Sequence, residues 1–191
     1  MRPWKRVDTP AGPRFVAEFY GHEVTVLRTM ATSIQEMLDD RQSAAPTDPL
    51  EQITGIRTGN PEPPRDATLS RLLPDFVAEQ SGLPADAGAA SALRSLHEPA
   101  IIDAKVAAAQ TLLDTLPDGG GKVELTEADA NAWVAAVNDL RLALGTMLGI
   151  GPDFPDQLPP QHPHARHLDV YHWMTVLQEY LVLGLMGKTV R

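Results

Sequence analysis

The stretch TEADANAWVAAVNDLRLALGTML, residues 126–148, decides the fold class of this chain. Thr126 is a good N-cap, because its hydroxyl can accept a hydrogen bond from a backbone N–H group of the first helical turn. Gly149 favours a helix end. The apolar residues between them recur at spacings of three and four, which places them on one face of a helix. They are Ala130, Trp133, Val134, Val137, Leu140, Leu144, Met147 and Leu148.

The same periodicity predicts further helices on both sides of this stretch. Long helices are expected over residues 23–41, 89–116 and 168–186, and a short one over residues 67–73. Pro99 lies inside the second of these and lacks a backbone N–H group, so it predicts a kink or a break there. A short amphipathic turn is expected at Leu50, Ile53 and Ile56.

The amino end has the pattern of a β-hairpin. Residues 4–8 and 14–20 flank a loop that contains proline and glycine. Phe15, Ala17 and Phe19 alternate with other residues, as in a strand with one buried face. A two-stranded ribbon is marginal alone, so it must pack on something. Residues 122–125 are expected to form a short strand that can pair with it.

We therefore predict one mainly α domain over residues 1–191. It is expected to be a helical bundle of about four to five helices with a small N-terminal antiparallel β-hairpin, a minor α+β character. The expected parts are the hairpin at 1–20, the helical core at 21–148, a proline- and histidine-rich loop at 150–167 and the C-terminal helix at 168–187.

Composition excludes several classes of function. The formal net charge of −9 gives little support to phosphate-led DNA binding, although Arg2, Lys5, Arg6 and Arg14 form a local basic patch that leaves direct DNA contact open. The chain has no cysteine, so its residues offer no disulfide, thiol nucleophile, thiolate zinc site or thiol redox sensor. No apolar run reaches the length of a bilayer span, and no signal peptide is recognised, so we expect a cytoplasmic protein without membrane contact.

A histidine cluster is the one candidate metal site. His162, His164, His167 and His172 fall within eleven residues, and imidazole is a good ligand for zinc, copper or nickel. No two of these histidines are four residues apart, so the usual helical ligand pair is missing. We interpret the cluster as a solvated loop and expect no metal and no other cofactor, with the four histidines kept as weak candidates.

The remaining candidates are residues for contact with a partner. Asn138 and Arg141 share a helix face and are suited to binding a carboxylate, although an interhelical salt bridge is the plainer interpretation of Arg141. Trp4 stands beside Lys5 and Arg6 at an end that we expect to be exposed, although packing under the hairpin would suit Trp4 equally well. No nucleophile, acid–base pair or phosphate loop has a motif around it, so we expect a protein that is not an enzyme.

Several blocks of sequence together resemble one known family. The blocks are residues 1–6, 48–50 with 55–56, 69–75, 132–133 with 138–145, and 170–173 with 177–179. In this order they resemble an actinobacterial family of unknown function, whose genes tend to lie beside the gene for the ClpS protease adaptor and whose named representative is an oxidative-stress regulator. Trp4, Lys5, Arg6 and Arg71 match these blocks and carry an aromatic or cationic group, so they become the expected contact residues.

The resemblance implies a regulator of transcription under oxidative stress that contacts a sigma factor or RNA polymerase. An acidic protein that binds a basic partner is consistent with that role. Two alternatives are kept: an accessory protein of ClpS- and Clp-linked proteolysis, and a metal-binding protein that uses the histidine cluster. Apolar residues on both sides of the last helix, at Tyr180, Leu181, Val182, Leu183 and Leu185, also leave room for a homodimer.

Overall fold

The computed structural model describes residues 2–46, 51, 55, 57–76 and 87–188. Within them the chain is mainly helical, as predicted, with a small antiparallel sheet at the start. The amphipathic turn expected at Leu50, Ile53 and Ile56 lies outside the described residues. The described helices are α1 (Gly21–Ser43), α3 (Ala67–Leu72), α4 (Ala87–Thr115), α5 (Glu127–Leu148) and α6 (Ala165–Leu185).

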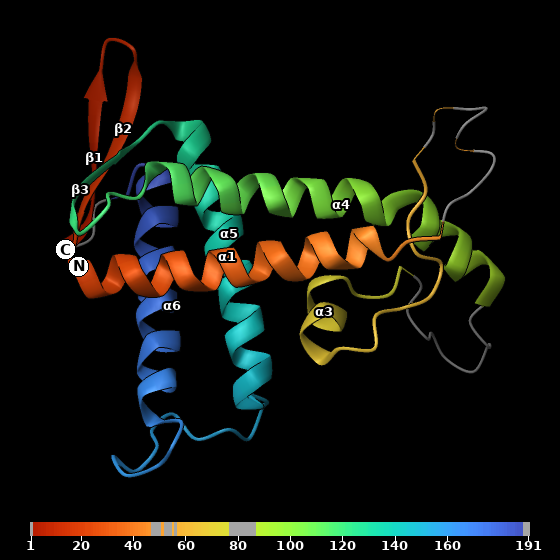
Figure 1. Cartoon of the computed structure of the whole chain (residues 1–191). Helices are drawn as coiled ribbons and strands as arrows, with labels where there is room; N and C mark the ends of the chain where they lie inside the picture. Colours follow the sequence, from red (N-terminus) through yellow and green to blue (C-terminus); the bar gives the residue numbers. More distant parts are fainter. Residues whose placement is uncertain (1, 47–50, 52–54, 56, 77–86, 189–191) are drawn as a thin grey trace.

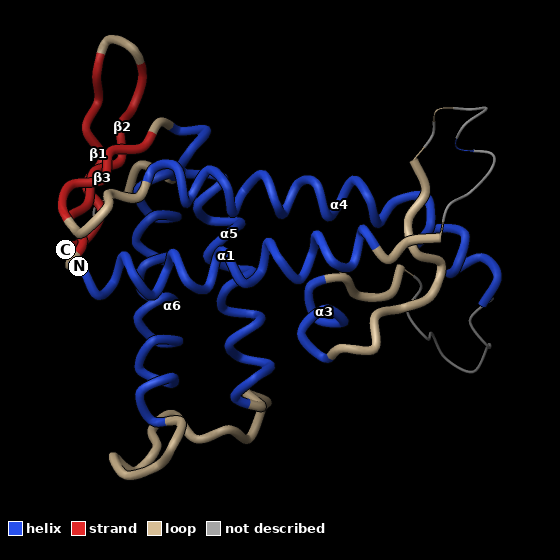
Figure 2. Tube along the Cα trace, in the orientation of Figure 1, coloured by secondary structure: helices blue, strands red, loops and turns tan. Residues whose placement is uncertain are grey.

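The long helices form two pairs. Figure 1 shows α1 and α4 lying side by side, with α5 and α6 forming a second pair that runs across them. Figure 2 places the sheet at the end of the first pair where α1 begins and α4 ends, while α3 lies toward the opposite end. No described helix has the combination of length and apolar character that would let it cross a membrane.

The hairpin is tighter than predicted, and the strand expected at residues 122–125 pairs with it. β1 (Arg2–Thr9) pairs with β2 (Gly12–Phe19), and β2 pairs with β3 (Gly121–Leu125), both antiparallel. The long loop expected around residues 9–13 is wrong, because Thr9 already pairs with Gly12. Gly12 has a φ of 104°, a conformation that glycine adopts without strain, and this permits the short turn.

The sheet packs on α5 through aromatic rings. Phe15, Ala17 and Phe19 face inward and are buried, as their alternation predicted. Trp133 of α5 is fully buried, with its ring centroid 5.5 Å from that of Trp4 and 5.7 Å from that of Phe19. These centroid distances are typical of attractive aromatic pairs. The rings therefore join the β-ribbon, which would be marginal alone, to the helical core.

The helix at residues 126–148 ends at the predicted caps. The Thr126 hydroxyl accepts a hydrogen bond from the Asp129 N–H group, and the Asp129 carboxylate accepts one from the Thr126 N–H group. Gly149 closes the helix with a φ of 69°. The predicted stripe is buried or half-buried, except at Met147, which is 53% exposed.

Pro99 does not divide α4, which continues through it as one helix. Proline has no N–H group, so the Ser95 carbonyl loses its usual helical donor. The Gly59 N–H group donates to that carbonyl instead, at 2.7 Å, and the Ser95 hydroxyl donates to the Gly59 carbonyl. A Cβ on Gly59 would lie 2.9 Å from Cδ of Pro99, so glycine permits this close approach. The segment before α3 is thereby held against α4.

Candidate functional site

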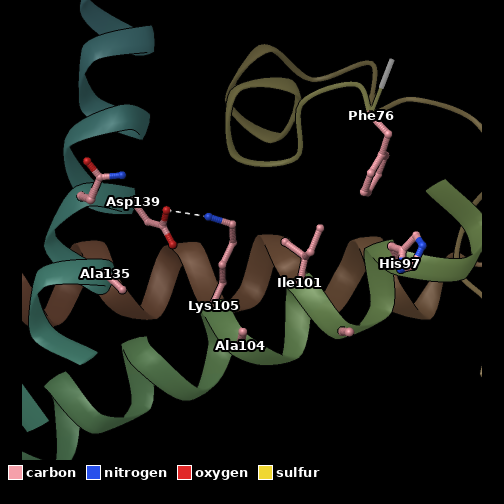
Figure 3. A pocket seen from close by; sticks show the side chains of 9 residues that line it. Phe76, His97, Ile101, Ala104, Lys105, Ala135 and Asp139 are labelled. Atoms are coloured by element: carbon pink, nitrogen blue, oxygen red, sulfur yellow. Dashed lines mark hydrogen bonds and ion pairs between the residues drawn. The ribbon is translucent and has the colours of Figure 1, made fainter. Parts of the chain in front are cut away.

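A groove between α4 and α5 is the candidate site. It has a volume of about 740 Å³, and Phe76, which follows α3, stands over it (Figure 3). α4 supplies one wall, α5 supplies the other, and the two helices pack against each other below. The lining residues are Phe76, His97, Ala100, Ile101, Ala104, Lys105, Ala135, Asn138 and Asp139.

Most of the groove surface is apolar. Ala104 of α4 and Ala135 of α5 are exposed on its two walls, and Ile101 is half-buried between Phe76 and Lys105 in Figure 3. Short alanine side chains leave space above the helix backbones. An apolar side chain of a partner can therefore enter, and its burial would provide binding energy.

An ion pair marks the end of the groove nearest α5. The Lys105 ammonium lies 2.7 Å from the Asp139 carboxylate, and the two side chains are 20% and 8% exposed. Burial raises the pKa of Asp139 above its usual value of 3.8, against the opposing effects of the hydrogen bond and charge of Lys105. The groove thus holds a poorly hydrated carboxylate whose charge is already offset by Lys105.

Asn138 lies beside this pair and is half-buried. Its side-chain amide forms no hydrogen bond with the residues that the structure describes. An amide carries two donors and one acceptor, so it can bind backbone groups of a partner. This placement agrees with the expectation that Asn138 is a contact residue, which stays a prediction.

Replacement of Asp139 by asparagine is expected to change stability in a pH-dependent way. Because the folded-state pKa is raised, folded Asp139 binds more protons than unfolded Asp139 just above pH 3.8. The free energy of unfolding of the wild-type protein should therefore fall, relative to Asp139→Asn, as pH rises from 3.8 through the folded-state pKa. Urea unfolding of both proteins between about pH 3.5 and about pH 7 measures their free energies of unfolding. A wild-type free energy of unfolding that rises relative to that of Asp139→Asn over this pH range would show that Lys105 outweighs burial.

A buried network of charges holds Phe76 over the groove. The Arg94 guanidinium donates to the Glu98 carboxylate at 2.8 Å and to the Leu73 carbonyl at 3.2 Å. The Phe76 ring centroid lies 5.6 Å from the guanidinium carbon of Arg94, within cation–π distance. Arg41 of α1 binds the other side of Glu98, at 2.7 Å. The network thus joins α1, α4 and the segment after α3.

The other contact candidates lie elsewhere. Arg141 donates hydrogen bonds to Thr175 and Gln178 of α6 and lies over the Tyr171 ring, so it joins α5 to α6, and it has no acidic partner among the described residues. Arg71 is exposed on α3, away from the groove lining. Neither residue meets Asn138 in one site.

Trp4 is not available as a surface contact. Trp4 is only 5% exposed, because it packs against Phe19 and Trp133. Of the two alternatives, packing in the core is therefore correct, and the expectation of an exposed Trp4 was wrong. Lys5 and Arg6 are exposed on β1, an edge strand of the sheet. Arg6 pairs with Asp8, and Arg14 lies 3.9 Å from Glu124, so acidic neighbours offset part of the basic patch.

The four candidate histidines are exposed at the start of α6. This helix begins at Ala165, three residues earlier than predicted, so His167 and His172 are helical and the loop is shorter than 150–167. The His162 and His164 rings lie 5.6 Å apart between centroids. Among the described residues, no group of three or more histidine, aspartate or glutamate side chains is arranged to hold a metal ion.

Sequence reasoning missed most of the groove. Phe76, His97, Lys105 and Asp139 come from three separate segments, and nothing local brings them together. One signal was present: Arg94 and Glu98 are four residues apart in an alanine-rich helix, which is the spacing of a helical ion pair.

Comparisons with known proteins cover nearly the whole chain. A family model described as "Domain of unknown function (DUF2017)" matches residues 1–185. Proteins named "Oxidative stress regulator AosR" from Mycobacterium bovis and Mycobacterium tuberculosis are 57% identical over 195 residues, covering 98% of this chain and 89% of theirs. A "Putative oxidative stress regulator AosR" from Mycobacterium leprae is 53% identical over 194 residues, with the same coverage. No solved structure matches the chain significantly.

Proposed function

Because the chain belongs to the DUF2017 family and is 57% identical to proteins named oxidative stress regulators, we propose that it is a regulatory protein of the oxidative stress response. The finer proposal is that it is not an enzyme and regulates transcription by contact with a sigma factor or RNA polymerase. The observation that carries the regulatory role is the identity to these relatives along 98% of the chain.

The groove between α4 and α5 supports action through a protein partner. Its apolar walls suit a segment that carries apolar side chains, and the Asn138 amide can form hydrogen bonds with that segment. The net charge of −9 attracts a basic partner surface at long range. Phe76 adds an aromatic ring, a type of side chain that is enriched in protein interfaces.

Ala104→Arg is expected to abolish capture of the partner without unfolding the protein. Ala104 is exposed on the groove wall, so a long cationic side chain there fills the space and repels a basic partner. Arginine has a helix propensity close to that of alanine, so α4 should stay folded. Ala107→Arg is the matched control, because Ala107 is exposed on the same helix and does not line the groove.

Affinity purification from oxidant-treated mycobacterial cells, followed by mass spectrometry, measures the capture. The wild-type protein and Ala107→Arg should recover a sigma factor or a polymerase subunit, and Ala104→Arg should not. Recovery of Clp protease components without any transcription protein would contradict the proposed partner and favour a role in proteolysis. Equal recovery by both arginine variants would place the contact outside the groove.

A further inference from the structure

A second groove, between α1, α5 and α6, is lined by methionine. Met30 and Met37 of α1 and Met147 of α5 line this groove, which has a volume of about 620 Å³. Five methionines have described side chains, so more than half of them meet here. The other two lie elsewhere: Met174 is fully buried in the core, and Met186 is exposed beyond α6.

The groove methionines are accessible to small oxidants. Met147 is 53% exposed, and Met30 and Met37 are half-buried in an open groove. Oxidation of a thioether depends on access to its sulfur, and methionine sulfoxide is reversible by reductases. Because the chain has no cysteine, the thioether is the side chain that provides reversible two-electron oxidation here.

We propose that Met147, Met37 and Met30 form the oxidant-sensitive site of this chain. The oxidant is hydrogen peroxide. The thioether sulfur attacks one peroxide oxygen, a sulfur–oxygen bond forms and the oxygen–oxygen bond breaks. The second oxygen leaves as hydroxide and takes up the proton that the sulfur-bound oxygen releases, which gives water. The sulfur is oxidised by two electrons, and the peroxide is reduced.

The surroundings suit the sulfoxide product. Arg166 and His167 of α6 line the same groove, are exposed, and carry N–H donors for a sulfoxide oxygen. Arg166 forms no ion pair with a residue in the described part of the chain, so its guanidinium is available. Ile34, Leu144 and Val170 give the groove an apolar surface in the reduced protein. Oxidation therefore adds polar groups to an apolar groove whose lining also carries N–H donors.

The regulatory consequence, unlike the modification itself, rests on the proposed function. α5 lines both grooves: Met147 and Leu144 belong to the methionine groove, and Ala135, Asn138 and Asp139 belong to the groove proposed to contact the partner. A polar, chiral group at one end of this helix changes its packing against α1 and α6. We expect partner capture to differ several-fold between the reduced and the oxidised protein.

Stepwise oxidation of the full-length protein with hydrogen peroxide, followed by peptide mass spectrometry, tests the site. Met147 should be oxidised as fast as Met186, with Met30 and Met37 next and Met174 last, while far-ultraviolet circular dichroism stays unchanged. Oxidation of the groove sulfurs no faster than Met174 would overturn the proposal.

Leucine variants then test the consequence. The triple variant combines Met30→Leu, Met37→Leu and Met147→Leu. It should fold, because volume-conserving apolar substitutions are well tolerated. Peroxide should no longer change how much partner this variant captures. Met186→Leu is the matched control and should respond to peroxide like the wild-type protein. In both proteins, methionine sulfoxide reductases should restore the capture of the partner.

Equal capture by reduced and oxidised wild-type protein, or a peroxide response that persists in the triple variant, would overturn the switch and leave the proposed function standing. If neither form captures a transcription protein, the proposed function fails, while the mass spectra still decide the oxidation site.

Discussion

Glu98→Gln is expected to lower the free energy of unfolding by about 3–5 kcal/mol, the usual cost of breaking a buried ion pair from one side. Glu98 is 1% exposed and accepts hydrogen bonds from Arg41 and Arg94, whose side chains are 9% and 3% exposed. Glutamine keeps the volume but removes the charge, so Arg41 loses this carboxylate and Arg94 keeps only its ion pair with the exposed carboxylate of Asp75. Urea unfolding at about pH 7 measures the loss in free energy of unfolding.

Asp103→Asn is the control for this change. Asp103 also binds an arginine, Arg57, but its side chain is 57% exposed. An exposed ion pair contributes about 0–1 kcal/mol, because water and salt screen it. Similar losses for the two variants would contradict the assignment of Glu98 as a buried centre of charge. Since Arg94 also contacts Phe76, Glu98→Gln should weaken partner capture even at temperatures where the protein stays folded.

Trp133→Ala is expected to cost about 3–5 kcal/mol, in the range of large-to-small substitutions of buried aromatic residues. The indole is 0% exposed, contacts Trp4 and Phe19, and donates from Nε1 to the Thr115 hydroxyl at 2.7 Å. Alanine removes these contacts and leaves a cavity where the sheet meets α5. The chevron of folding and unfolding rates, together with equilibrium urea unfolding, gives the free-energy change.

Trp173→Ala tests whether the position of the tryptophan decides this cost. Trp173 is half-buried on α6, and its Nε1 has no hydrogen-bond partner within the described structure. Its replacement removes less buried surface and no such bond, so a clearly smaller loss is expected. If Trp173→Ala destabilised the protein as much as Trp133→Ala, the aromatic contact between sheet and α5 would not be the main anchor of the ribbon.

The site could be predicted only in part. Asn138 was chosen from its helix position and does line the groove, whereas Trp4 was chosen for an exposed end and lies in the core. The difference has a physical cause. Asn138 lies on a long helix whose face is set by local periodicity, but the exposure of Trp4 depends on whether α5 approaches it from a distant part of the chain.

Residues 126–148 determined by themselves that this segment is a helix with Thr126 and Gly149 at its ends, because helix periodicity and capping act within a few residues. Short-range patterns of the same kind also determined the other helices and which face of β2 points inward. Only the tertiary structure decided that Met147 is exposed in a methionine-lined groove, that Glu98 joins Arg41 to Arg94, and that Lys105 meets Asp139. These contacts join different helices or depend on which helix covers which face, and a periodic pattern does not specify how helices pack against one another.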